Sequence, residues 1–424
     1  KDCVSADDCA VWLGSGSIWK LLDNGEGTGE TATFVMNFSE EYDCDGPNCQ
    51  SIFFATSTDL VSWSPVAPDA AKKSGLVFKY NASDYAVGGR WDCIAVLPRP
   101  GGGYYGYWTA TPLPKRDNPS FCGEGKSCGA GFGQSDDGLH WTTLPTPGPK
   151  VSAEVGGVAQ LGGRTFMTFA AGHLYDADAP TGPFQVSRVN AKFLTQEGHS
   201  AFARLWGEPY TQDQNMVLVT HQQVVSNQLV CAGLVKRAVL GSDGVLRAQW
   251  WDANNALRGD SLPIQTTAAS PLLSTTCVAD CLYSGLWLEG TFVAGKQSIA
   301  GLWLQTTRGG FAFGASNSTP SIFELGSMPS PGMFTASGAY APISIDRGII
   351  FKPGQTASWR ALIRTVRLNH TLVEFYIDDV LTLPFTLPDS VGPVTGNFAG
   401  LGGSIATAAY RLTLPHLSQH VSMV

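Results

Sequence analysis

The sequence predicts an all-β protein in which a five-bladed β-propeller is followed by a β-sandwich. Composition is the first reason: only 15% of the 424 residues are charged, and there are 49 glycines and 25 prolines. Such a chain favours short strands and turns over long helices. The second reason is that no long segment has helical periodicity. The third is a turn sequence that occurs twice in the first half of the chain.

Short apolar or alternating runs divide the first 260 residues between Gly, Pro and Asp turns. We expect strands at residues 33–37, 51–55, 94–97, 104–109, 164–169, 216–220 and 230–235. Two turns, Ser57-Thr-Asp-Leu-Val-Ser-Trp63 and Ser135-Asp-Asp-Gly-Leu-His-Trp141, each place an Asp four residues before a Trp, and Ser242-Asp-Gly-Val-Leu is a looser echo. Small sheets that recur in this way are typical of propeller blades, although coincidental hairpins are the competing interpretation.

A change of composition divides the chain near residue 261. Residues 261–276 are rich in Pro, Ser and Thr and carry no charge, which is typical of a linker between a propeller at 1–260 and a domain at 277–424. In the second domain we expect strands at residues 285–292, 301–306, 311–314, 360–366 and 371–377. Strands at this spacing favour a β-sandwich.

Several classes of function are excluded or disfavoured by the residues themselves. The formal net charge is −8 and no basic stripe occurs, so nucleic acid is not an expected partner. No apolar run reaches the ~18 residues that a membrane-spanning helix needs. Phosphate-loop, dinucleotide-binding, nucleophile-elbow and metal-ligand spacings are missing, so we expect neither a metal nor another cofactor.

Cysteines and glycosylation sequons predict a protein of the secretory pathway. Eight of the ten cysteines form close pairs, which leaves two for a long-range disulfide. The close pairs are Cys3/Cys9, Cys44/Cys49, Cys122/Cys128 and Cys277/Cys281, and the remaining two are Cys93 and Cys231. Zinc is disfavoured because no pair has CxxC spacing. N-linked glycans are expected at Asn37, Asn81, Asn317 and Asn369. The start at Lys1, without an apolar leader, agrees with a mature protein that is secreted or retained in the lumen.

Four segments resemble the invertase/inulinase family of glycoside hydrolases, the family 32 type. They are Phe53-Phe-Ala-Thr-Ser-Thr-Asp-Leu-Val-Ser-Trp63, Gly89-Arg-Trp-Asp-Cys-Ile94, Ser152-Ala-Glu-Val-Gly-Gly157 and Leu368-Asn-His-Thr-Leu-Val-Glu-Phe-Tyr376. The resemblance implies a five-bladed propeller followed by a sandwich. It also implies that Asp92 stabilises the transition state and that Glu154 is the general acid. Arg90 is expected either to pair with Asp92 or to bind a ligand oxygen.

The nucleophile of that family has no counterpart at the matching place. There the sequence reads Trp12-Leu-Gly-Ser-Gly-Ser-Ile-Trp19, which contains no carboxylate. Serine and glycine cannot form the glycosyl ester that a retaining hydrolase requires. Asp8 is the alternative nucleophile, although Cys9 is expected to close a small loop with Cys3.

Aromatic and histidine side chains are the candidate substrate-binding groups. Five aromatic residues occur in segments that lead to the propeller centre, and three further residues are expected at the mouth of a pocket. The first group is Trp12, Trp19, Trp91, Tyr107 and Trp108, and the second is His199, Phe202 and His221. Core packing is the competing interpretation for the aromatics, and a satisfied surface or core position for the histidines.

Three hypotheses of function follow. A secreted, cystine-rich, all-β chain with an eroded hydrolase motif resembles the fungal hetero-Diels–Alderases of tropolone sesquiterpenoid biosynthesis. This resemblance implies cycloaddition of a tropolone quinone methide with a terpene alkene, with dehydration of the precursor as an added step. The alternatives are a fructan or furanoside hydrolase that uses Glu154 and Asp92, and a carbohydrate-binding protein without catalytic activity.

Overall fold

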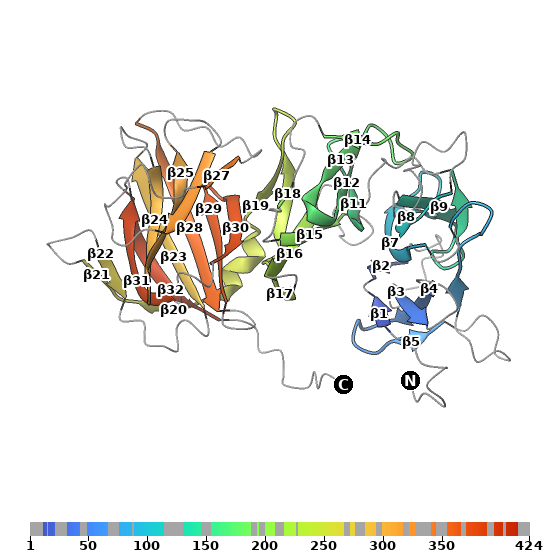
Figure 1. Cartoon of the computed structure of the whole chain (residues 1–424), viewed down its shortest axis with the longest axis horizontal. Helices are drawn as coiled ribbons and strands as arrows, with labels where there is room; N and C mark the ends of the chain where they lie inside the picture. The colour runs from blue at the N-terminus through green and yellow to red at the C-terminus, as the bar shows by residue number, and fades with distance from the viewer. Residues whose placement is uncertain are drawn as a thin grey trace. The chain divides into compact units, whose positions relative to one another are not determined.

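The computed structural model describes about two thirds of the chain. The described residues are 12–14, 16–21, 32–42, 49–66, 76–86, 89–113, 130–145, 154–187, 193–194, 200–207, 216–225, 228–266, 272–275, 285–293, 299–316, 322–327, 341–344, 354–365, 370–387, 394–401 and 404–413. Apart from the short 3-10 helices η2 (Ala170–Gly172) and η3 (Asp252–Leu257), their regular elements are strands (Figure 1). None of the described helices is long and apolar enough to cross a membrane. The expected all-β class is confirmed.

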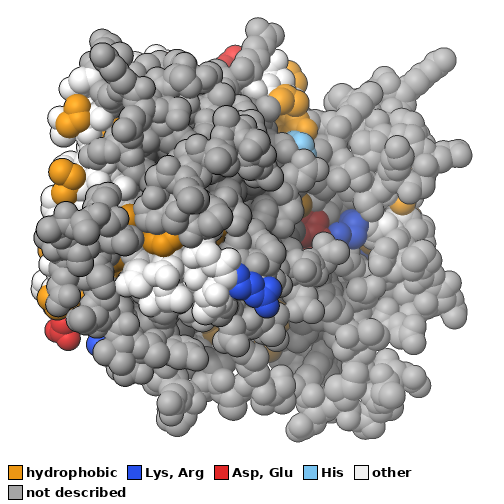
Figure 2. All heavy atoms as spheres, turned by 60° about the vertical axis from the view of Figure 1, so that its left-hand side comes forward, with side chains coloured by type: hydrophobic (Ala, Val, Ile, Leu, Met, Phe, Trp, Pro, Cys, Tyr) orange, Lys and Arg blue, Asp and Glu red, His pale blue; other side chains and the backbone are white. Residues whose placement is uncertain are grey.

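Two compact units make up the chain, and each has its own core. Unit 1 comprises Lys1–Ala191 and Phe202–Val219, and unit 2 comprises Lys192–Ala201 and Thr220–Val424. On the face in Figure 2, the described hydrophobic side chains form only small separate groups. Buried apolar side chains form core clusters within each unit.

Unit 1 contains three successive antiparallel sheets, the arrangement expected of propeller blades. The first joins β1 (Trp12–Gly14), β3 (Phe34–Tyr42), β4 (Cys49–Ser57) and β5 (Ser64–Pro65), with β2 (Ile18–Lys20) on β3 and β6 (Val77–Phe78) on β4. The second has the order β10 (Thr142–Leu144), β9 (Ala130–Ser135), β8 (Tyr104–Ala110) and β7 (Trp91–Pro98). The third runs through β14 (Gln185–Val186), β13 (Leu174–Ala177), β12 (Arg164–Phe169) and β11 (Val155–Leu161), which β15 (Ser200–Trp206) meets in parallel.

The repeated turns of the sequence have the same hydrogen bonds in the structure. The Ser57 hydroxyl accepts the Leu60 N–H (2.9 Å), and the Ser135 hydroxyl accepts the Gly138 N–H (2.8 Å). The carboxylates of Asp59 and Asp137 each accept the N–H groups of the residues two and three positions further along the chain. The two turns are therefore structural repeats rather than coincidences of sequence.

Unit 2 contains most of β16 (Val217–Val225), then β17 (Gln228–Ala232), β18 (Lys236–Leu240) and β19 (Leu246–Gln249), and a two-sheet sandwich. β19 leads into a sheet of β30 (Val380–Thr386), β29 (Thr371–Ile377), β28 (Thr356–Thr365), β23 (Leu286–Val293), β32 (Ile405–Leu412) and β20 (Arg258–Leu262). The other sheet has the order β21 (Ile264–Thr266), β22 (Leu272–Thr275), β31 (Val394–Leu401), β24 (Ile299–Thr306), β25 (Gly309–Ser316), β26 (Ile322–Ser327) and β27 (Ala341–Ser344). Apolar side chains of both sheets form one core cluster.

The described part of residues 261–276 is strand, which corrects the expectation of a linker. β20 pairs with β32, and β22 pairs with β31 and β21. Half-buried Leu262 and Ile264 pack against the sandwich core. The second compact unit takes in the chain from Thr220 onward, and the propeller boundary expected at residue 260 stays a prediction.

Candidate functional site

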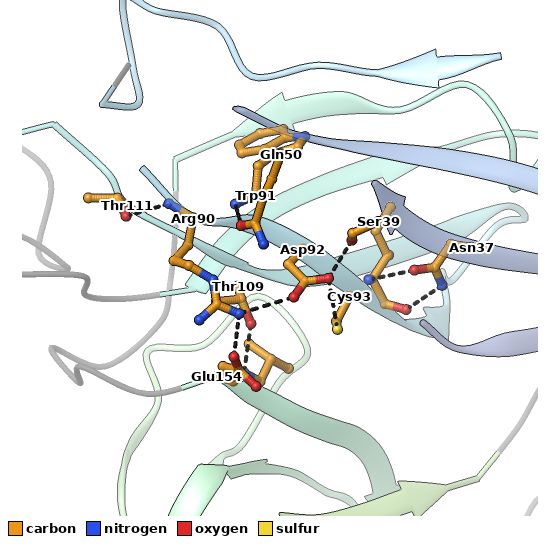
Figure 3. A network of polar contacts seen from close by, with 12 residues as sticks. Asn37, Ser39, Gln50, Arg90, Trp91, Asp92, Cys93, Thr109, Thr111 and Glu154 are labelled. Atoms are coloured by element: carbon orange, nitrogen blue, oxygen red, sulfur yellow. Dashed lines mark hydrogen bonds and ion pairs between the residues drawn. The ribbon is translucent and has the colours of Figure 1, made fainter. Parts of the chain in front are cut away.

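The structure brings Arg90, Asp92 and Glu154 together in unit 1 (Figure 3). Arg90 lies just before β7, Asp92 lies within β7, and Glu154 directly precedes β11. Arg90 Nη2 donates to Asp92 Oδ2 (3.0 Å) and also to Glu154 Oε1. One guanidinium nitrogen therefore joins the two carboxylates that the sequence singled out.

Two threonines of the neighbouring strand hold the backbone on both sides of this cluster. The Arg90 N–H donates to Thr111 Oγ1 (3.0 Å). The Val155 N–H donates to Thr109 Oγ1 (3.0 Å), which fixes the chain next to Glu154. β8 and the residue after it thus position Arg90 and Glu154 relative to each other.

Asp92 is enclosed by protein donors. Its side chain is 1% exposed, and its Oδ1 accepts hydrogen bonds from Ser39 Oγ and from Cys93 Sγ (3.1 Å). Cys93 has a φ of 54°, and the β7–β8 register shifts between Asp92 and Ala95. A bulge of this kind changes the direction of the side chains beside it. Asp92 is therefore placed to hold Arg90 rather than to contact a sugar.

The Cys93 sulfur is present as a buried thiol, which corrects the expected link to Cys231. Cys93 Sγ donates to the adjacent Asp92 carboxylate. The β-bulge between Asp92 and Ala95 sets the direction of the Cys93 side chain. The side chain of Cys231 lies outside the described residues. So do Cys3, Cys9, Cys44, Cys122, Cys128, Cys277 and Cys281, and Cys49 is described only in its backbone. The four close disulfides stay predictions.

Asn37 connects three segments of unit 1, so the expected glycan at this position is also a correction. The side chain is fully buried, and its Nδ2 donates to the carbonyls of Ser17 and Ile94, each at 3.0 Å. Its Oδ1 accepts the Ile94 N–H (3.0 Å). A glycan on this nitrogen is incompatible with those bonds. Asn81 is exposed, as a glycan requires, whereas Asn317 and Asn369 lie outside the described residues.

The segment that lacks the nucleophile lies beside Asp92, as the resemblance implies. β1 and β2 both pair with β3, with Gly14 opposite Ser39 and Ile18 opposite Met36. Ser39 is the residue that donates to Asp92. The described residues 12–14 and 16–21 contain no carboxylate, and Asp8 lies outside the described part of the chain.

Arg90 and Glu154 are the accessible members of the cluster. Their side chains are 23% and 29% exposed, whereas that of Asp92 is closed to solvent. Burial acts to lower the pKa of Arg90, but the carboxylates of Glu154 and Asp92 outweigh it and raise that pKa above its ordinary value. The guanidinium is therefore permanently charged.

Part of the hydrogen-bonding capacity of this pair is not used by the protein. The buried Arg90 Nε has no acceptor among the described residues. In Figure 3 the other terminal nitrogen of Arg90 points away from both carboxylates and carries no bond. The described residues also provide no donor to Glu154 Oε2. The pair thus offers both donors and an acceptor to a ligand.

The candidate aromatic residues are core residues, which corrects the substrate-binding expectation. Trp19, Trp91, Tyr107 and Trp108 are at most 1% exposed and belong to the two core clusters of unit 1. Trp91 and Trp108 meet edge to face with ring centroids 5.2 Å apart. The Tyr107 hydroxyl donates to the Pro180 carbonyl, and burial raises its pKa. The competing interpretation, core packing, is correct for these four.

His221 is also buried instead of lying in a loop. It is fully enclosed within β16 of unit 2, and its backbone carbonyl accepts the Gly233 N–H (2.8 Å). Its imidazole lies so close to Gly233 that a Cβ there would overlap the ring, which explains the glycine. His199 and the side chains of Trp12 and Phe202 lie outside the described residues, so their roles stay predictions.

Sequence reasoning missed Ser39, Thr109 and Thr111. A signal was available for Ser39, because it alternates in β3 with Asn37 and Val35 and therefore shares their buried face. A polar residue on a buried face must find a partner. No sequence pattern distinguishes Thr109 and Thr111 in this way, because threonine is common in strands for packing alone. No group of three metal-ligating side chains occurs within the described ranges.

The fold and the site define a propeller-plus-sandwich protein on a glycoside-hydrolase-like scaffold. No family model matches the chain, and no curated protein matches its sequence. A solved structure that it resembles is the family 32 β-fructofuranosidase of Bombyx mori. The TM-score is 0.59 at 11% identity, covering 92% of this chain and 78% of that chain. At this identity the likeness shows the fold.

Weaker likenesses concern family 43 glycoside hydrolases. A thermostable member has a TM-score of 0.34 at 15% identity, covering 56% of this chain and 76% of that chain. A β-xylosidase/α-arabinofuranosidase from a compost microbial metagenome has a TM-score of 0.36 at 14% identity, covering 55% and 74%.

Proposed function

We propose that this protein is a small-molecule cyclase on a glycoside-hydrolase-like scaffold. Its reaction is the intermolecular hetero-Diels–Alder cycloaddition of a tropolone quinone methide with a terpene alkene. The observation that supports this proposal is the state of the site: a partly exposed, permanently charged Arg90 lies beside a segment without a nucleophile. The protein acts in the secretory-pathway lumen or outside the cell, with a glycan on exposed Asn81.

A cycloaddition needs only what this site offers. Two new bonds form in one step from the electrons of the diene and the alkene, and no protein atom is covalently bound. The protein contributes by holding both partners in a reactive pose, which removes the entropy of their encounter from the barrier. Arg90 N–H groups donate to the quinone methide oxygen, on which negative charge accumulates as the bonds form.

Glu154 is assigned to orienting a substrate hydroxyl with its available oxygen. Dehydration of a hydroxylated precursor would supply the quinone methide. The side-chain hydroxyl leaves as water with a proton taken from solvent, and the ring hydroxyl returns a proton to solvent, so no proton is gained or lost overall.

The site argues against the hydrolase alternative at three places. The nucleophile carboxylate is missing from the described residues next to Ser39. Asp92, the expected stabiliser, has its oxygens bonded to Ser39, Cys93 and Arg90. Glu154, the expected acid, is held by Arg90 through Oε1. A carbohydrate-binding protein needs none of these groups and is the outcome to test against.

The direct test is incubation of a tropolone quinone methide precursor and a terpene alkene with and without the protein. We expect a single product stereoisomer only when the protein is present, and loss of that selectivity in Arg90→Met. Arg99→Met is the matched control, because Arg99 forms an ion pair with Asp136 in the same unit and is similarly exposed, at 21%. Racemic product formed at the same rate without protein would refute the proposal.

Release of sugar from sucrose, inulin or arabinan would favour the hydrolase if Glu154→Gln abolishes it. Binding of those sugars without turnover would favour the carbohydrate-binding protein. Either result refutes the cyclase when it occurs without the stereoselective product.

A further inference from the structure

We propose that Gln50 is a positioning residue for Arg90, because Gln50 and Thr111 together fix the two peptide groups that meet at the Arg90 Cα. The inference deepens the proposed function by naming what directs the side chain on which that function depends. It rests on the proposed function only for the consequence of a misplaced Arg90. The placement of Arg90 is itself measured without any reaction.

The backbone of β7 needs hydrogen-bond partners on the side away from β8, because β7 is the last strand of its sheet. Buried backbone groups at such an edge must be satisfied from elsewhere. Side chains of the first sheet supply these partners. Asn37 bonds both the N–H and the carbonyl of Ile94, and Gln50 Oε1 accepts the Trp91 N–H (3.1 Å). Gln50 belongs to β4 and is 4% exposed, so it replaces a strand partner directly beside Arg90.

The position of Arg90 at the start of β7 gives the Gln50 bond a second effect. The Arg90 N–H donates to Thr111 Oγ1 (3.0 Å), and the following N–H, that of Trp91, donates to Gln50. Figure 3 shows Thr111 and Gln50 on opposite sides of this backbone. Because peptide groups are planar, a residue turns only about φ and ψ. Holding the peptide groups before and after the Arg90 Cα therefore fixes the direction of its Cα–Cβ bond.

The ion pairs of Arg90 do not replace this control. Its Nη2 is bonded to Asp92 and Glu154, which fixes where the guanidinium ends but not how the side chain reaches that point. The Glu154 carboxylate is also 29% exposed, so water competes for its bond. The direction in which the side chain leaves the backbone decides where the enclosed Nε and the other terminal nitrogen lie.

Exchange of the Arg90 Nε proton with solvent measures the placement directly. Because Nε is enclosed, this proton should exchange slowly in the full chain, and its NMR signal is identified by its loss in Arg90→Met. Gln50→Met removes the acceptor of the Trp91 N–H at nearly constant shape. Loss of this buried hydrogen bond should raise the population of displaced Arg90, and with it the exchange rate, about tenfold.

Tyr107→Phe is the matched control, because it also removes one buried bond from a side chain to the backbone of unit 1, that to the Pro180 carbonyl. It should lower the melting temperature about as much as Gln50→Met without changing exchange of the Arg90 proton. Thr111→Val should act like Gln50→Met, whereas Thr111→Ser keeps the hydroxyl and should preserve slow exchange. Gln50→Asn withdraws the amide by one methylene and gives the same test if Gln50→Met does not fold.

The inference is overturned if Gln50→Met leaves the exchange of the Arg90 Nε proton unchanged, or if Tyr107→Phe accelerates it equally. In the cycloaddition assay, Gln50→Met should lose the product stereoselectivity that Tyr107→Phe keeps. If the exchange results hold but no cycloaddition occurs, the proposed function fails and the positioning role stands. If cycloaddition occurs and Gln50→Met does not alter the exchange, the proposed function stands and this inference fails.

Discussion

A buried ion pair between β18 and β29 gives the most demanding test of the packing of unit 2. Lys236 and Glu374 are 0% and 1% exposed in their side chains, and Nζ lies 2.5 Å from Oε1. Lys236 also donates to the Leu234 carbonyl (2.6 Å), and the other Glu374 oxygen accepts the Leu234 N–H (3.3 Å). The two charges pair with each other, and the Leu234 backbone adds a bond to each. Removing one leaves its partner charged in the protein interior.

The burial of this ion pair determines how much stability each variant should lose. Glu374→Gln and Lys236→Met should each lower the free energy of unfolding by about 3–5 kcal/mol, because an unpaired buried charge is left behind. The double variant Lys236→Met/Glu374→Leu should cost much less than the sum, since neither charge remains.

The assay is urea unfolding followed by tryptophan fluorescence, to which Trp250 and Trp287 of unit 2 contribute. Asp243→Asn is the control, because it breaks the surface pair of Asp243 and Arg247, in which the carboxylate is 52% exposed. That control should cost no more than about 1 kcal/mol. The reasoning is refuted if either single variant costs as little as the control, or if the double variant costs the sum of the singles.

Three further predictions concern unit 1. Leu60 has a φ of 61°, in the turn that has Gly138 (φ 76°) at the matching place, so Leu60→Gly should raise the free energy of unfolding by up to about 1 kcal/mol in urea titrations. No gain in stability would contradict this explanation of the strain. Hydrogen bonds from the backbone of its own turn, that of Ser62 first, lower the pKa of Asp59 from 3.8 to about 2. Because the pKa of Asp59 is lower in the folded state, its stabilising effect is complete above about pH 4 and is lost as the pH falls through 2. NMR titration of the Asp59 carboxyl should give a pKa of about 2. An ordinary pKa would refute this prediction. Expression through a secretory pathway should add an endoglycosidase-sensitive glycan at exposed Asn81, and peptide mapping that finds this residue unmodified would contradict the prediction.

Strands with a clear local pattern were predictable to within a residue or two. Residues 104–109, 164–169 and 371–377 were expected as strands, and the structure has Tyr104–Ala110, Arg164–Phe169 and Thr371–Ile377. Each is bounded by turn residues and is rich in aromatic or β-branched side chains, which fit a pleated and partly buried surface. Local sequence is enough where pattern and turn chemistry agree.

The prediction of a linker at 261–276 was wrong because a lack of charged residues has two explanations. A segment lacks charge either because it is an unstructured connection or because strands bury it. The partners that decide the matter, β31 and β32, lie more than a hundred residues away in sequence. Long-range pairing of this kind leaves no local signal.

The site was predictable in its charged residues and not in its aromatic ones. Arg90, Asp92 and Glu154 could be placed because each stands in a segment that resembles a known motif. Whether Trp91 and Trp108 face a ligand or a neighbouring sheet depends on how the sheets pack, and both proved to pack against Phe78. The hydrogen-bond partners of Asp92 were likewise set by tertiary pairing, since Ser39 comes from another sheet.

The missing nucleophile and the closed Asp92 are two consequences of one packing arrangement. Gly16 lies against the Asn37 carbonyl so closely that a Cβ would overlap it, and the Ser17 carbonyl accepts the Asn37 N–H (3.0 Å). Asn37 in turn binds Ile94, on the same strand as Asp92. Gly16→Asp should therefore lower the melting temperature and release no sugar from sucrose, because the added side chain displaces β3 instead of reaching a substrate. A well-folded Gly16→Asp variant that hydrolyses sucrose would contradict this packing argument. The packing predicts instead that one substitution at Gly16 is not enough for hydrolysis, since Asp92 would still be bonded to Ser39, Cys93 and Arg90.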